Sequence, residues 1–243
     1  MSLTDRLNEM RNHGGPALTA GLTDETVRNF SRRDDRLAEA VQSAYAAFLR
    51  LQETEPEFLA MDEQGQIEYV QGGYVNFYAD DAINPYISLA GNGPWLVSVK
   101  GAVLFDAGGY GMLGFGHVPE KILEAMNQDH VMANVMTPNL SQRYLVDRLR
   151  REIGHRRGEC PFSRFLCVNS GSEAVAVGAR LSDVNTKLMT DPGGRYASRP
   201  TRILSLKDGF HGRTQRPAQF SDSTRQNYCR HLASFRDHDD LIT

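Results

Sequence analysis

Apolar residues recur near the start of the chain with the spacing of an amphipathic helix. Between Asp35 and Gln52 they fall at Leu37, Val41, Tyr45, Phe48 and Leu49 or Leu51. This spacing lies along one face of a 3.6-residue period, so it predicts a helix over 35–52. Residues 1–22 are polar and glycine-containing and predict a mobile arm. Glycine and proline breakers over 53–94 predict loop and irregular structure.

The pattern changes to alternation after Pro94. The stretch WLVSVKGAVLFDAGG alternates apolar and polar positions. It predicts two strands around a turn at Lys100-Gly101. Beyond it, Pro119 can begin a helix that runs to about Gln128. Ser141 can cap a further helix through Ile153.

Strands and helices then alternate in the second half of the chain. We expect a strand over 164–168, a helix over 172–181 and a second strand over 202–206. Such alternation predicts an α/β fold, a mostly parallel sheet with helical cover. The sequence shows no internal repeat. The predicted organisation is an N-terminal helical arm and irregular segment over 1–94, a hairpin and glycine-rich crossover over 95–118, and an incomplete large domain over 119–243.

Composition and charge narrow the class of protein. The chain has 243 residues, 40% of them hydrophobic, with 27 basic and 30 acidic residues and a net charge of -3. This balance disfavours nucleic acid as a partner, because phosphate neutralisation needs a basic surface. No apolar window reaches the roughly 18 residues of a membrane span, and the N-terminus lacks a secretory core. Three cysteines form no disulfide or zinc spacing, and Cys167 is expected to be buried. We therefore expect a cytoplasmic protein.

A glycine-rich stretch satisfies the regular expression of a dinucleotide site. It runs from Gly109 to Gly114 as GYGMLG. A dinucleotide fingerprint needs a strand directly before it and a helix that opens on its third glycine. Here the next helix can begin only near Pro119, so we interpret the stretch as a loop that bends or approaches another group closely.

A short polar turn separates the expected strand and helix of the second half. It reads Asn169-Ser-Gly-Ser-Glu and differs from the G-x-S-x-G elbow of a hydrolase. Ser172 can cap the helix, and the helix N-terminus can bind an anion through its free N–H groups. Both uses are compatible. Glu173 in the first turn suits the helix dipole without any catalytic role.

The second expected strand is followed by Phe210-His-Gly-Arg-Thr214. Arg213 is a candidate clamp for a carboxylate or a phosphate, because its guanidinium offers a bidentate fork. The plain alternatives are a surface arginine and, for His211, a structural histidine. The two strand exits would lie at the same carboxyl edge of a parallel sheet, where such folds bind ligands.

Three stretches together resemble the class III aminotransferases, pyridoxal-phosphate enzymes of fold type I that include the ornithine, acetylornithine and 4-aminobutyrate group. They are Lys100-Gly-Ala-Val-Leu-Phe-Asp106 continuing to Leu113-Gly-Phe-Gly-His-Val-Pro119, then Asn169-Ser-Gly-Ser-Glu-Ala174, and Phe210-His-Gly-Arg-Thr214. Their order and spacing agree with the family. The resemblance covers roughly Leu96 to Ser223 and implies the N-terminal portion of such an enzyme.

The resemblance gives these residues roles. Gly171 and Ser172 would bind the phosphate of pyridoxal 5'-phosphate, and Phe210 would stack on its pyridine ring. His211 would help to shape the cofactor pocket, and Arg213 would bind a substrate carboxylate. The implied reaction is amino transfer from an amino-acid or amine donor to a keto acid. The implied assembly is a homodimer or a complementary chain that completes the site.

The chain departs from its family in one respect. A pyridoxal enzyme also needs a carboxylate at the pyridine nitrogen and a Schiff-base lysine. None of the four lysines, Lys100, Lys121, Lys187 and Lys207, stands at the family's position after Phe210. The catalytic lysine is therefore unassigned. Three interpretations stay open: a truncated enzyme, one subunit of a split enzyme, and a non-catalytic subunit. Aminomutases and decarboxylases share the fold, so they remain alternatives to transamination.

Overall fold

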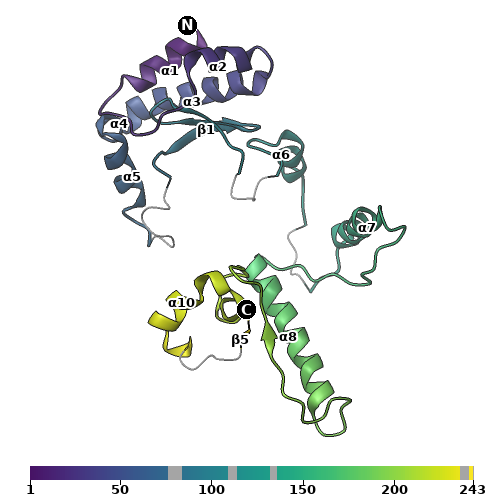
Figure 1. Cartoon of the computed structure of the whole chain (residues 1–243). Helices are drawn as coiled ribbons and strands as arrows, with labels where there is room; N and C mark the ends of the chain where they lie inside the picture. Colours follow the sequence, from purple (N-terminus) through teal and green to yellow (C-terminus); the bar gives the residue numbers. More distant parts are fainter. Residues whose placement is uncertain (76–83, 109–113, 132–135, 236–240, 243) are drawn as a thin grey trace. The chain divides into compact units, whose positions relative to one another are not determined.

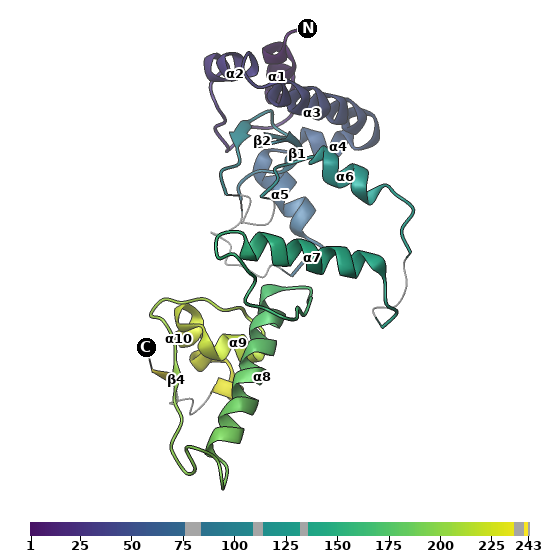
Figure 2. The same ribbon diagram turned by 90° about the vertical axis from the view of Figure 1, so that its right-hand side faces the viewer.

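A computed structural model of the chain describes all residues except 76–83, 109–113, 132–135, 236–240 and 243 (Figures 1 and 2). The chain divides into two compact units, Met1–Met132 and Ala133–Thr243. No helix in the described ranges is long and apolar enough to cross a membrane.

The first unit combines helices with a three-stranded antiparallel sheet. Strand β2 is central, because it pairs with β1 on one side and β3 on the other. The elements of this unit are α1 (Leu3–Arg11), α2 (Asp24–Ser31), α3 (Asp35–Thr54), α4 (Pro56–Ala60), α5 (Glu63–Gln71), β1 (Ser88–Asn92), β2 (Trp95–Ser98), β3 (Val103–Phe105) and α6 (Glu120–Met126).

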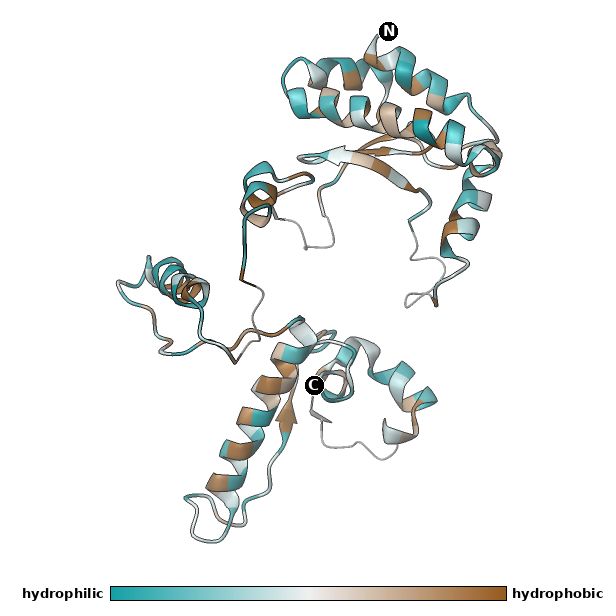
Figure 3. Cartoon of the chain, turned by 180° about the vertical axis from the view of Figure 1, so that it is seen from behind, coloured by the Kyte–Doolittle hydropathy of each residue, from teal (hydrophilic) through white to brown (hydrophobic). Residues whose placement is uncertain are grey.

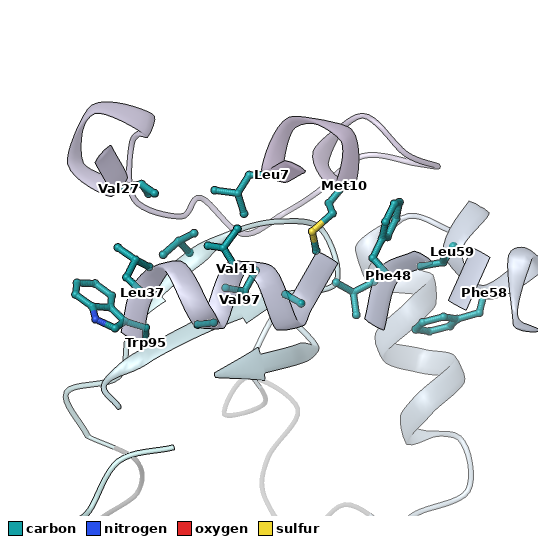
Figure 4. Close-up of a cluster of buried hydrophobic side chains, with 14 residues drawn as sticks. Leu7, Met10, Val27, Leu37, Val41, Phe48, Phe58, Leu59, Trp95 and Val97 are labelled. Atoms are coloured by element: carbon teal, nitrogen blue, oxygen red, sulfur yellow. The ribbon is translucent and has the colours of Figure 1, made fainter. Parts of the chain in front are cut away.

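Helix α3 organises the core of this unit. It lies between the sheet on one side and α1 and α2 on the other (Figure 4). Its expected apolar face is confirmed at Leu37, Val41 and Phe48, which are almost fully buried. The strands contribute Trp95, Val97 and Val103 to the same cluster. Burial of this apolar area is the main stabilising contribution to the unit.

Asp34 joins the start of α3 to the sheet. Its carboxylate caps the helix by accepting from the Arg36 N–H, and it accepts from Trp95 Nε1–H at 2.9 Å. Arg36 also donates to it from Nε and Nη2, each at 2.8 Å. These donors, the Arg36 guanidinium first, lower the pKa of Asp34 to about 2.

Two expectations for the N-terminal segment are wrong. Residues 1–22 are not a mobile arm, because α1 buries Leu7 and Met10 completely against the core. A capping box between Ser2 and Asp5 fixes the start of the helix. Residues 53–94 are not irregular throughout, since α4, α5 and β1 lie within them. Pro56 begins α4 at the first helical position, where proline is tolerated.

The expected hairpin is confirmed by β2 and β3, and Gly101 takes a positive φ of 68° in its turn. The expected helix at Pro119 is confirmed as α6. The next expected helix is confirmed as α7, but its N-cap is Asn139 and not Ser141. The Asn139 side chain accepts from the Ser141 N–H. In return, the Gln142 side chain accepts from the Asn139 N–H.

The second unit is mostly helical in its described part. Helix α9 packs against α8, and α10 follows α9 (Figure 2). Strands β4 and β5 form a parallel pair, Ile203 with Leu241 and Leu204 with Ile242. The elements of this unit are α7 (Leu140–Gly154), α8 (Gly171–Thr190), β4 (Ile203–Leu204), α9 (Gln215–Phe220), α10 (Asp222–His231), the 3₁₀ turn η3 (Ala233–Phe235) and β5 (Leu241–Ile242).

The expected helix after residue 171 is confirmed and is longer than predicted. The expected strand over 164–168 is wrong, because these residues take no part in a sheet. Leu166 is 69% exposed, and Cys167 is exposed and not buried as expected. An apolar run forms a strand only where a neighbouring strand offers a hydrogen-bonding edge. The mixture of helices and strands is compatible with an α/β fold, and the described parallel pairing is β4 with β5.

Candidate functional site

The polar turn before α8 is held by its own side chains. Ser170 is the N-cap, since its Oγ accepts from the Glu173 N–H at 3.2 Å. Glu173 in return accepts from the N–H groups of Asn169 and Ser170 at 2.7 and 3.0 Å. The cap is therefore Ser170, and the alternative that Ser172 caps the helix is wrong. Sequence reasoning could have found this, because S-x-x-E is the pattern of a capping box.

This capping leaves two backbone donors and one hydroxyl without a protein partner among the described residues at the helix start. In the described part of the chain, the N–H groups of Gly171 and Ser172 have no protein acceptor, and Ser172 Oγ has no hydrogen-bond partner. Free N–H groups at the positive end of the 20-residue helix α8 favour an anion. The turn therefore still has donors suited to a phosphate group after Ser170 has capped the helix.

The structure brings the two polar motifs into contact. Gly212 is buried and has a φ of 114°, in the region that favours glycine. A Cβ added at Gly212 would lie 2.9 Å from Ser172 Cβ and 3.1 Å from Ser172 Cα. Side chains do not tolerate such distances to neighbouring atoms. The backbone at Gly212 thus lies directly beside the start of α8, and only glycine fits there.

The side chains around Gly212 are partly open to solvent. Phe210 is 56% exposed, so its ring has surface available for a second aromatic ring. Arg213 is half-buried, and its Cζ lies 6.0 Å from the centre of the Phe210 ring, a cation–π contact. His211 is half-buried as well. The predicted residues Ser172, Phe210, His211 and Arg213 therefore belong to one region of the second unit.

Residues that sequence reasoning missed hold this loop in place. The Ser221 hydroxyl accepts from the His211 N–H at 2.8 Å. Asp222 accepts from the Asp208 N–H at 2.8 Å, and the Ser223 N–H donates to the Gly209 carbonyl at 3.2 Å. The sequence signal was the run of small polar residues at the junction of α9 and α10, from Ser221 into the first turn of α10, which is typical of side chains that bond nearby backbone.

An ion pair joins the two helices α8 and α9 of the same region. Arg216 of α9 donates to Asp183 of α8 through Nη2 and Oδ2 at 2.8 Å. Both side chains are substantially exposed, so the pair contributes at most about 1 kcal/mol. Its effect is to help keep α9, and the loop before it, beside α8.

The first stretch of the resemblance contains a different contact. His117 Nε2 and Asp106 Oδ2 are 2.9 Å apart, and His117 exchanges backbone hydrogen bonds with Gly93. These residues line an open cavity of about 530 Å³ in the first unit, together with Arg36 and Phe115. Residues 109–113 of the predicted glycine-rich loop lie outside the described residues. We place the anion chemistry at Ser172, where two helix N–H groups have no protein acceptor among the described residues.

The four lysines differ in their environments. Lys100 is 2% exposed, and its ammonium donates to the carbonyl oxygens of His13, Gly15 and Met61 at 3.3, 3.0 and 2.6 Å. Burial lowers the pKa of Lys100, and all three of its protons are used. Lys187 pairs with Asp191 at 2.6 Å. Lys100 is therefore a structural lysine of the first unit.

Comparison with protein families identifies the chain. The family model for class-III aminotransferases matches residues 78–237, which contain all three stretches described above. The chain belongs to this family, as predicted, and the match covers part of a class III aminotransferase. Class III aminotransferases generally use pyridoxal phosphate for transamination. No curated protein matches the chain.

The residues present fit part of this cofactor. The unsatisfied N–H groups of Gly171 and Ser172 suit the phosphate, and the exposed ring of Phe210 suits the pyridine. No lysine follows Phe210 in the sequence. The described residues therefore fit the phosphate group and the pyridine ring of the cofactor.

Proposed function

We propose that this chain provides the phosphate- and ring-binding part of a pyridoxal-phosphate site for amino transfer between an amino donor and a keto acid. The observation that carries the proposal is the contact between Ser172 and Gly212. It joins the motif suited to the phosphate and the motif suited to the ring. These motifs lie about 40 residues apart in the sequence, and the family match includes both.

Each residue has a distinct part in this proposal. Gly171 and Ser172 donate to the phosphate by their N–H groups, and Ser172 adds its hydroxyl. Phe210 supports the face of the ring, and His211 shapes the pocket beside it. Arg213 binds the carboxylate of a substrate through its guanidinium fork. When bound, pyridoxal phosphate supplies the electron sink of the reaction.

Glu173 has no catalytic part in the proposal. Its carboxylate already accepts two backbone N–H groups, those of Asn169 and Ser170. A carboxylate held in this way stabilises the turn and is not aimed at a substrate. Its charge at the helix start also opposes the approach of an anion, so the phosphate must be held by directed donors.

The lysine and the ring-nitrogen carboxylate would come from a partner chain or from a further part of the protein. Helix α8 supports this, because it has no buried residue and carries apolar side chains along its length (Figure 3). Leu181 and Leu188 are 68% and 70% exposed, and Leu204 of β4 is 82% exposed. Exposed apolar area of this kind indicates an interaction surface. We infer a homodimer or a complementary chain as the occupant.

The cellular setting is part of the proposal. Cys160, Cys167 and Cys229 are all free thiols. Free thiols, two of them exposed, fit a reducing compartment and therefore the cytoplasm.

A ligand titration tests the proposal. The chain is titrated with pyridoxal phosphate, with pyridoxal and with inorganic phosphate, and cofactor absorbance or fluorescence is followed. We expect pyridoxal phosphate to bind more tightly than pyridoxal, and inorganic phosphate to compete. Equal affinity for the two aldehydes would contradict the phosphate assignment.

A non-catalytic subunit is the second candidate, because the buried Lys100 is committed to three carbonyl groups. Such a subunit would bind pyridoxal phosphate without turning over any amino donor, even with its partner present. An aminomutase or a decarboxylase would use the same phosphate turn, and analysis of the products separates these reactions from transamination.

A further inference from the structure

A fully buried hydroxyl lies behind the loop that carries Phe210 and Arg213. Ser221 is 0% exposed. Its Oγ accepts from the His211 N–H at 2.8 Å and lies 3.1 Å from the Gly212 carbonyl oxygen and 3.0 Å from the Pro217 carbonyl oxygen. A buried hydroxyl is costly unless it is hydrogen-bonded, and this one has a donor and two acceptors. It therefore fixes the backbone at two consecutive residues, His211 and Gly212.

The neighbours of Ser221 fix the other end of the same loop. Asp222 accepts from the N–H of Asp208, which has a φ of 59°. Ser223 bonds the carbonyl of Gly209 through both its N–H and its hydroxyl, each at 3.2 Å. The loop between Asp208 and Gly212 thus has a left-handed residue at each end, and the junction of α9 and α10 holds both ends. A residue other than glycine, such as Asp208, keeps a left-handed conformation only where its surroundings hold it there.

We propose that Ser221 is a positioning residue of the cofactor site. It acts through His211 and Gly212, and it sets Gly212 against Ser172. The spacing between the ring of Phe210 and the phosphate-binding turn then depends on the Ser221 hydroxyl. This inference rests on the proposed function, because the residues that it positions are those assigned to the phosphate and the ring.

The substitution Ser221→Ala tests the inference, and Ser223→Ala is the matched control. Both variants remove one hydroxyl that bonds this loop, but Ser223 is exposed and its N–H still holds Gly209. Two quantities are measured on the whole chain: pyridoxal phosphate affinity by titration, and amide hydrogen exchange over 208–213. For Ser221→Ala we expect affinity to fall about tenfold and the His211 amide to exchange at least about tenfold faster. Ser223→Ala should stay within about twofold of the unmodified chain in both.

Conservative variants separate positioning from a loss of folding. Ser221→Thr keeps the hydroxyl and should restore both quantities. If Ser221→Ala does not fold, Ser221→Cys replaces it, because a thiol has a similar size but is a weak hydrogen-bonding group. Unchanged exchange at His211, or equal effects of Ser221→Ala and Ser223→Ala, would overturn the inference. If the unmodified chain does not bind pyridoxal phosphate, the proposed function fails, while the exchange at His211 still decides whether Ser221 fixes the loop.

Discussion

The buried backbone of Gly212 lies directly against Ser172 at the start of α8, close enough that a methyl group at Gly212 would overlap the Ser172 side chain. Ser172 carries donors suited to a phosphate, and Gly212 lies two residues after the candidate ring-stacking side chain of Phe210. The contact therefore fixes the distance between the candidate phosphate-binding turn at Ser172 and the loop that carries Phe210, which lie far apart in the sequence. Substitutions at Gly212 and at Ser172 should therefore have different and measurable effects.

Gly212→Ala should remove this contact. An alanine at a φ of 114° is strained, and its Cβ would overlap Ser172. We expect the second unit to lose about 1–3 kcal/mol of unfolding free energy, measured by circular dichroism in urea, and cofactor affinity to fall at least about tenfold. Gly178→Ala is the control, because nothing lies within 4 Å of a Cβ at that position of α8. That variant should be neutral or stabilising by up to about 1 kcal/mol, since alanine favours helix over glycine.

The two serines of the turn should separate stability from binding. Ser170→Ala removes the N-cap of α8 and should lower the unfolding free energy by about 1 kcal/mol. Ser172→Ala removes no hydrogen bond within the described residues, so it should change stability by less than about 0.5 kcal/mol. It should weaken pyridoxal phosphate binding by about 1–3 kcal/mol, because a donor to a charged group is lost. If Ser172→Ala leaves the titration unchanged, the phosphate assignment is wrong.

Lys100 should matter for folding and not for the cofactor. Lys100→Met removes the donor to three buried carbonyl groups and should destabilise the first unit by about 2–4 kcal/mol. Fluorescence of Trp95, the one tryptophan in the sequence, reports this unfolding in a denaturant titration. The exposed Lys121 provides the control, and Lys121→Met should stay within about 0.5 kcal/mol. A loss of cofactor affinity in Lys100→Met without any loss of stability would contradict the structural role.

Asp34 should make the unfolding free energy of the first unit depend on pH in the acidic range. Its pKa is about 2 in the folded chain, against 3.8 for the free group, so the folded state favours the charged form. The stabilisation is therefore complete above pH 3.8, decreases as the pH falls below that value, and is lost as the pH falls through about 2. Asparagine can still cap the helix but cannot pair with the Arg36 guanidinium, so the unfolding free energy of Asp34→Asn should be lower by up to about 1 kcal/mol near neutral pH, and this difference should shrink in acid. A difference that does not change with pH would contradict this role.

The local pattern predicted the elements that have strong periodicity. Helix α3 follows from its apolar face, since Leu37, Val41 and Phe48 recur at helical spacing. Helix α1 was missed because its nine residues bury only Leu7 and Met10. Its polar composition gave no signal that tertiary packing would order it.

The strand over 164–168 shows the opposite error. Its apolar run suits a buried strand, but strand formation depends on hydrogen bonds from residues far away in the sequence. Cys167 was expected to be buried for the same reason, and it is exposed. Composition alone does not say which neighbours a strand will have.

The sequence predicted individual residues of the candidate site but not their arrangement. Sequence motifs identified Ser172, Phe210 and Arg213, but the contact between Ser172 and Gly212 depends on how α8 and α9 pack. Ser221 could not be predicted as a buried residue, because serine is usually exposed and no local pattern distinguishes it from Ser223.

The central claim is that this chain holds pyridoxal phosphate without supplying its lysine. We would mix the chain with one equivalent of pyridoxal phosphate and record its native mass, then reduce with borohydride and record the denatured mass. The account predicts one cofactor per chain in the native spectrum and the mass of the unmodified chain after reduction and denaturation. Absence of the native complex, or a stoichiometric reduced adduct on one lysine of this chain, would contradict it.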